Sequence, residues 1–150
     1  MMSRVDRFIL SEALRTEVLV HLLDCAPNEG AGMIGAHSPQ ETDYGTIARA
    51  AVFVPGRNTD FSPTHYTMDP LDVIRAFRLF REQGLELGAI VHSHIASPAT
   101  PSVTDVREWN YPEAMMMIAS FAHQPPELRA WRIVEQDGLS RVQRIVIENG

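Results

Sequence analysis

The sequence contains a single cysteine, Cys25, among its 150 residues. One cysteine cannot form an internal disulfide, so the chain lacks the cross-links typical of small secreted proteins. Residues 1–7 also lack the apolar core of a secretory signal. These absences predict a protein of the reducing cytoplasm.

The sequence also lacks a long apolar run and a cluster of basic residues. No stretch approaches the ~20 apolar residues that a helix needs to span a bilayer. The formal net charge is -6, whereas binding to nucleic acid or to an anionic membrane requires a clustered positive surface. We therefore expect neither a nucleic acid nor a membrane as a partner.

The composition is that of an ordinary globular protein, with 45% hydrophobic and 21% charged residues. A chain of this length buries roughly 70% of the surface that its unfolded form exposes, which is enough for one core. The sequence contains no internal repeat, linker or low-complexity segment. We therefore expect one domain that spans residues 1–150.

Capping residues and apolar spacing predict two long helices. Ser11 begins a helix that runs to about Ala26, and Asp69 with Pro70 begins a second helix that ends at Gly84. The side chains expected to be buried are Leu14, Val18, Leu19, Leu22 and Leu23 on the first helix, and Leu71, Ile74 and Phe77 on the second.

The remaining apolar segments are typical of strands, at residues 29–36, 46–54, 85–91, 114–122, 128–135 and 139–147. Residues 115–121 are apolar at both alternating positions, which predicts a central strand covered on both faces. Residues 37–45 and 57–68 are expected to be loops. This order of elements predicts an α/β fold in which a single mixed β-sheet is flanked by helices.

Two histidines follow the predicted strand at 85–91. His92 and His94 are two residues apart, so in an extended chain their side chains point to the same face. A proline-containing loop then leads to Ser102 and Asp105, which have the spacing of a capping box for a short helix to about Asn110. Two imidazoles and a carboxylate, with a fourth position open, are the ligand set of a catalytic zinc site. We therefore predict one Zn²⁺ ion bound by His92, His94 and Asp105, and we expect the other four histidines to be solvated or structural.

Glu29 and Ser102 are candidates for the catalytic groups that an amide-hydrolysing zinc site needs. Zinc would lower the pKa of a water molecule to roughly 7, and a carboxylate would then move its proton to the leaving amine. Glu29 begins a glycine-rich segment in which the chain can come close to the metal, and the alternative base motif His-Glu-x-x-His is absent. The hydroxyl of Ser102 would donate to the tetrahedral oxygen.

The pattern His92-x-His94, seven residues, Ser102, two residues and Asp105, with Glu29 upstream, resembles the signature of the JAMM/MPN-domain zinc-dependent isopeptidases. The order of elements agrees over nearly all of the chain, and the short length resembles the compact bacterial branch. The resemblance implies a three-layer, cytidine-deaminase-like architecture. It also implies that His92, His94 and Asp105 are zinc ligands, that Glu29 is the general acid/base, and that Ser102 stabilises the oxyanion.

The resemblance further implies a partner, namely a ubiquitin-like or sulfur-carrier protein with a glycine-rich C-terminal tail. The chain would be a metalloprotease that cleaves a peptide or isopeptide bond at that tail. An extended tail would form main-chain hydrogen bonds along a strand edge beside the metal. The glycine-rich strand after Glu29 is where we expect it to dock.

Two positions depart from the pattern of the bacterial branch. Ala31 stands where a cysteine is common in the segment after the glutamate, and Ile95 stands where a proline commonly follows the second histidine. We expect the first change to leave the chemistry intact. The second is expected to alter the loop beside the substrate groove, and hence specificity.

Two other functions stay open at this point. A non-catalytic MPN-type interaction scaffold would keep the fold for partner assembly, but it usually lacks one or more ligands, and here all are present. A zinc deaminase would need His-x-Glu and Pro-Cys-x-x-Cys, which this chain with its one cysteine does not contain. The sequence leaves open the substrate, the leaving group and the oligomeric state, with a homodimer among the alternatives.

Overall fold

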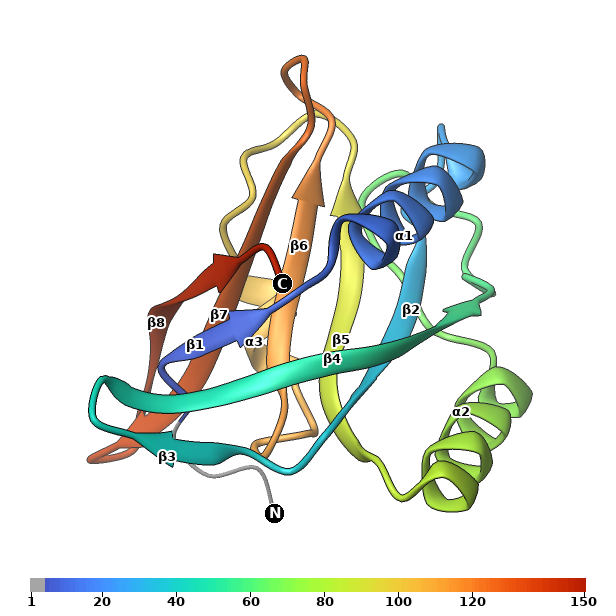
Figure 1. Cartoon of the computed structure of the whole chain (residues 1–150). Coiled ribbons are helices and arrows are strands. Elements are labelled where there is room, and N and C mark those ends of the chain that lie inside the picture. The colour runs from blue at the N-terminus through green and yellow to red at the C-terminus, as the bar shows by residue number, and fades with distance from the viewer. Residues whose placement is uncertain (1–4) are drawn as a thin grey trace.

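The computed structural model of the chain describes residues 5–150 (Figure 1). Residues 1–4, part of the segment that lacks a secretory signal, lie outside the described residues. The described elements are β1 (Arg7–Ile9), α1 (Glu12–Cys25), β2 (Ala31–Ala36), β3 (Gln40–Thr42), β4 (Gly45–Gly56), α2 (Pro70–Gln83), β5 (Glu86–His94), α3 (Val103–Arg107), β6 (Met115–Ser120), β7 (Glu127–Gln136) and β8 (Leu139–Glu148).

The strands of residues 5–150 form one mixed sheet in the order β1-β8-β7-β6-β5-β2-β4-β3. β5 and β6 are parallel, whereas β2 is antiparallel to both of its neighbours. β1 pairs in parallel with β8 and also with β4, so the sheet closes on itself. The predicted α/β fold with a mixed sheet and flanking helices is confirmed. The sequence did not predict this closure. The closing strand β1 has only three residues, which is too short to show an alternating pattern.

The two long helices cover opposite faces of the sheet. Val18 of α1 is buried in a core cluster with Ile34 of β2, whereas Phe80 of α2 is buried in another with Met33. Neighbouring residues on a strand face opposite sides, so α1 and α2 lie on different faces of β2 (Figure 1). This arrangement agrees with the three layers that the resemblance implied.

The predicted caps of the long helices are confirmed. The Oγ atom of Ser11 accepts a hydrogen bond from the backbone N–H of Leu14, and the carboxylate of Asp69 accepts one from that of Leu71. Gly84 ends α2 with φ at 68°, a left-handed conformation that favours glycine. Neither these nor any other helix in residues 5–150 has the length and apolar character needed to cross a bilayer.

The predicted buried stripe of α2 is wrong. Leu71, Ile74 and Phe77 are exposed, and the buried residues of this helix are Asp72, Ala76 and Phe80. Asp72 can occupy the covered face because its carboxylate accepts a hydrogen bond from the backbone N–H of Arg57, at 2.9 Å. A pattern based on apolar residues alone cannot anticipate such a bond. On α1, Leu23 is likewise exposed rather than buried.

Several boundaries differ from the sequence prediction. The strand expected from residue 29 begins at Ala31, and the loop expected at 37–45 contains the short strand β3. Helix α3 ends at Arg107, earlier than the predicted Asn110. The loop at 57–68 is confirmed, with one isolated bridge between Asn58 and Met68. β6 is buried along its whole length and lies between β5 and β7, as predicted for a central strand.

Candidate metal centre

His92 and His94 lie at the end of β5, a strand with paired neighbours on both sides. His92 pairs with Ala31 of β2 and with Ile118 of β6, and both histidines are buried. Their ring centroids are 5.0 Å apart, so the predicted placement on one face is confirmed. A central strand therefore holds two side chains that could ligate a metal ion in a rigid, largely dry position.

Asp105 reaches the histidines through the start of α3. The Oγ atom of Ser102 accepts a hydrogen bond from the backbone N–H of Asp105 at 3.0 Å, and the backbone N–H of Ser102 donates to Oδ2 of Asp105 at 2.9 Å. This reciprocal pair is the predicted capping box. The same Oδ2 lies 3.2 Å from Nε2 of His92 and 3.1 Å from Nε2 of His94. The cap therefore also aims the carboxylate at the two imidazoles.

The three converging atoms fit one face of a tetrahedral zinc site. The Nε2 atoms of His92 and His94 are 3.2 Å apart, similar to their distances from Asp105. A tetrahedral zinc ion with bonds of about 2.0 to 2.1 Å separates its ligands by about 3.3 Å. Nδ1 of His94 lies 2.7 Å from the carbonyl oxygen of Pro98, which can only accept, so Nδ1 carries a proton and Nε2 is the nitrogen that a metal ion would bind.

The electrostatic surroundings favour the metal-binding forms of Asp105 and His92. At His94, by contrast, hydrogen bonds to Asp105 and to the carbonyl of Pro98 outweigh burial and raise the pKa, so a metal ion would have to displace a proton there. Burial alone would raise the pKa of Asp105, but hydrogen bonds to His92 and His94 outweigh burial and lower this pKa, so the carboxylate stays ionised. Burial lowers the pKa of His92, which favours its neutral imidazole. An ionised carboxylate and a neutral imidazole are the metal-binding forms.

Glu29 lies just before β2 and is anchored beside the histidines. Its backbone N–H donates to the carbonyl of Ser62 at 2.8 Å, and its carbonyl accepts from the side-chain amide of Asn58 at 3.0 Å. The next residue, Gly30, donates its backbone N–H to Oγ of Ser93, which stands between the two histidines. The Glu29 side chain is buried, and this burial raises its pKa to about 7. The structure thus places a carboxyl group with a raised pKa next to the cluster.

Ser102 is exposed at the start of α3. Its Oγ atom accepts the capping bond from Asp105, so its own O–H remains available to donate. The five residues predicted from the sequence therefore come to one region of the molecule from three segments: the residues just before β2 (Glu29), the end of β5 (His92 and His94) and the start of α3 (Ser102 and Asp105).

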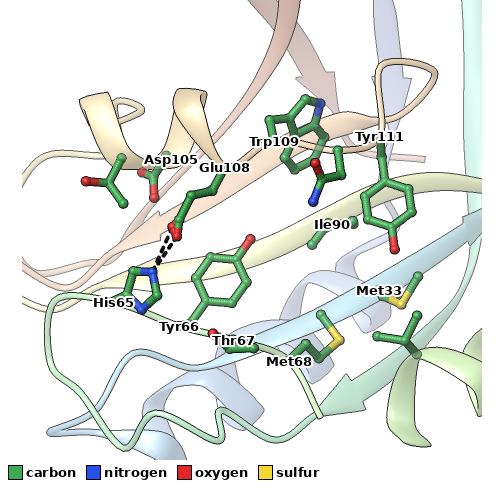
Figure 2. A pocket seen from close by; sticks show the side chains of 13 residues that line it. Met33, His65, Tyr66, Thr67, Met68, Ile90, Asp105, Glu108, Trp109 and Tyr111 are labelled. Carbon is green, nitrogen blue, oxygen red and sulfur yellow. Dashed lines mark hydrogen bonds and ion pairs between the residues drawn. The ribbon is translucent and has the colours of Figure 1, made fainter. Parts of the chain in front are cut away.

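A cavity of about 430 Å³ opens beside Asp105 and involves residues that the sequence did not single out (Figure 2). Tyr66 stacks on His92, with ring centroids 4.7 Å apart and planes at 23°. Nε2 of His65 lies 2.7 Å from a carboxylate oxygen of Glu108, and its Nδ1 lies 2.5 Å from one of Asp60. His65 is thus structural, as expected, but it joins the 57–68 loop to the end of α3. No periodic pattern signals this contact, because it depends on tertiary packing.

Residues 11–134 match the family model described as prokaryotic homologs of the JAB domain. The chain belongs to this family. The prokaryotic JAB chain is 36% identical over 102 residues to a protein of Thermus thermophilus named "Probable TtuB-protein conjugate cleaving protease", and the match covers 66% of the chain. It is 33% identical over 92 residues to the "Desampylase" of Pyrococcus furiosus, over 61% of the chain. These two matches span only 62% and 63% of the relatives' own lengths.

Other relatives match over more of their length. The "CysO-cysteine peptidase" of Mycobacterium bovis is 29% identical over 129 residues, covering 85% of this prokaryotic JAB chain and 83% of the relative. A solution structure of a protein from Desulfitobacterium hafniense superposes with a TM-score of 0.77 at 28% identity, over 95% of this chain and 94% of that one. A protein from Salinibacter ruber gives a TM-score of 0.66 at 28% identity, over 96% and 91%.

Proposed function

We propose that this prokaryotic JAB chain is a zinc-dependent peptidase or isopeptidase, and that residues 1–150 form its single catalytic domain. Its substrate would be the C-terminal tail of a ubiquitin-like, sulfur-carrier-type protein, cut at a peptide or isopeptide bond. The observation that carries the proposal is the convergence of His92, His94 and Asp105 within 3.2 Å of one another, beside a buried glutamate. The names of the relatives, a conjugate-cleaving protease, a desampylase and a peptidase, support the substrate class.

Each residue of the centre would have a separate role in the hydrolysis. His92, His94 and Asp105 would hold the zinc ion, which when bound acidifies a water molecule and polarises the scissile carbonyl. Glu29, with its pKa raised to about 7, accepts a proton from that water and passes it to the leaving amine near neutral pH. The free O–H of Ser102 donates a hydrogen bond to the oxygen on which negative charge develops.

The docking place that we expected for the substrate tail, along β2, is wrong. β2 is hydrogen-bonded to β4 on one side and to β5 on the other, so it offers no free edge. The loop at 57–68 offers one instead. The backbone N–H of Thr59 donates to the carbonyl of Thr67. Main-chain groups of successive residues point in opposite directions along an extended segment, so those of Tyr66 and Met68 point away from Thr59. Both residues line the cavity beside Asp105, and we propose that the tail lies there (Figure 2).

The variant Glu29→Gln tests the proposed reaction. An amide keeps the size of the side chain but cannot accept the proton, so the variant should bind zinc like the wild type and lose hydrolysis by a factor of about 10² to 10⁴. Zinc content is measured together with cleavage of a C-terminally extended ubiquitin-like protein. Full activity in this variant would contradict the role of Glu29.

The alternative of a non-catalytic interaction scaffold predicts a different result. A scaffold would contain no zinc after purification, and added zinc would not raise its melting temperature. Ligand-linked stabilisation of the folded state by zinc would instead support a functional metal site.

A further inference from the structure

The two histidines of the candidate metal centre are held in different ways. Nδ1 of His94 donates to the carbonyl of Pro98, which fixes the ring. His92 is completely buried, yet its Nδ1 has no hydrogen-bond partner within residues 5–150. Metal-ligating histidines are usually oriented by a hydrogen bond from the second ring nitrogen. The orientation of His92 therefore needs another cause.

Tyr66 provides a contact that can orient this ring. Its phenol ring lies 4.7 Å from the His92 ring at an angle of 23°, which is a nearly parallel stack. The His94 ring, by contrast, is tilted by 59° relative to the His92 ring. A parallel stack resists rotation of the imidazole out of its plane. The electron-rich face of the phenol also favours the positive charge that a bound metal places on the imidazole.

The chain around Tyr66 is fixed on both sides. Asn58 donates from its amide to the carbonyl of His65 at 3.0 Å and accepts from the backbone N–H of Thr67 at 3.1 Å. The side chain of His65 is in turn bonded to Glu108, at the end of α3. These hydrogen bonds hold the segment that carries Tyr66 in place, and a residue that orients a neighbouring side chain must itself be held in this way.

We propose that Tyr66 is a positioning residue that orients the metal ligand His92 by ring stacking. The inference rests on the proposed metal site and adds a residue that the sequence pattern did not contain. The aromatic ring carries the effect, and the hydroxyl group is not needed for it.

Zinc affinity tests this role independently of hydrolysis. Affinity is measured by chelator competition on the purified full chain for the wild type, Tyr66→Phe and Tyr66→Leu. Tyr66→Phe keeps the stack and should bind within about twofold of the wild type. Tyr66→Leu removes it and should bind about 10 to 100 times more weakly, the usual effect of losing a group that supports a metal ligand. Tyr111→Leu is the matched control, because Tyr111 lines the same cavity, and it should bind like the wild type.

Two results would overturn the proposal: wild-type affinity in Tyr66→Leu, or equal losses in the phenylalanine and leucine variants. Tyr66→Met, which keeps apolar volume without a ring, is measured in parallel so that the result does not depend on the folding of one variant. The absorption spectrum of bound Co²⁺ gives a second readout, which should change in the leucine and methionine variants and not in Tyr66→Phe. A wild type that binds no zinc would overturn the proposed metal site itself, whereas zinc binding unaffected by loss of the ring would overturn only the role of Tyr66.

Discussion

Glu29 is the residue whose titration should set the pH dependence of hydrolysis. Burial raises its pKa to about 7, well above that of a carboxyl group in water. The proton acceptor is the ionised form, so kcat/KM should fall as the pH drops through this pKa and level off above it. A pH–rate profile of the zinc-loaded protein measures this. The charge of the bound zinc ion opposes the effect of burial, so the limb is expected between the ordinary pKa of glutamate and about 7, and a profile without an acid limb would contradict the role of Glu29 as proton acceptor.

Ser102 caps α3 and is proposed to stabilise the oxyanion, and the two roles can be separated by variants. Ser102→Ala should lower kcat by a factor of about 10² to 10³ through loss of an oxyanion donor, and lower the free energy of unfolding by about 1 kcal/mol through loss of the cap. Ser11→Ala is the control, because it removes the cap of α1, remote from the centre. Ser11→Ala should lower the free energy of unfolding by a similar amount and leave kcat unchanged. Equal kcat values in the two variants would show that Ser102 acts only as a helix cap.

At the scale of elements, the loop at 57–68 forms one wall of the cavity and is held in place by one side chain. Asn58 donates from Nδ2 to the carbonyls of Glu29 and His65 and accepts at Oδ1 from the N–H groups of Asp60 and Thr67. These four bonds use the whole hydrogen-bonding capacity of an asparagine. The same side chain therefore holds the loop together and ties it to the backbone of the proposed general base.

Asn58→Asp should disturb this element, because a carboxylate cannot donate to the two carbonyl groups. We expect a loss of about 1 to 3 kcal/mol in the free energy of unfolding, with faster proteolysis within residues 57–68. Denaturant unfolding and limited proteolysis measure both effects. Asn110→Asp, an exposed asparagine at the same cavity, should change neither. Unchanged stability and proteolysis in Asn58→Asp would show that the loop is held by other contacts.

At the scale of the whole molecule, local patterns predicted the parts of the centre and tertiary packing joined them. The period of a strand placed His92 and His94 on one face, and the spacing of a capping box placed Asp105 at the start of α3. The approach of Glu29, distant in sequence, was predicted from the glycine-rich segment that it begins and from resemblance to a family, and no periodic pattern signals it. Hydrogen bonding across β2 and β5 is what brings it to the histidines.

The features that the sequence did not reveal depend on contacts between distant segments. β1 closes the sheet through only three residues, and Tyr66 reaches His92 from a loop without periodicity. Helix α2 buries Asp72 and exposes Ile74 because a backbone N–H satisfies the carboxylate, so a face that carries a charged residue can be the covered one. Hydrophobic periodicity reports only the balance of apolar residues, and it cannot choose a face when a polar residue has a buried partner.

Cleavage of a ubiquitin-like protein that carries a C-terminal extension after its terminal glycines tests the central claim most directly. The zinc-loaded chain is incubated with a panel of such proteins, and mass spectrometry identifies the products. We predict a single cut at the end of the glycine tail, lost on treatment with a chelator and restored by added zinc. Intact substrates across the panel, or cleavage that continues undiminished after the metal is removed, would contradict the account.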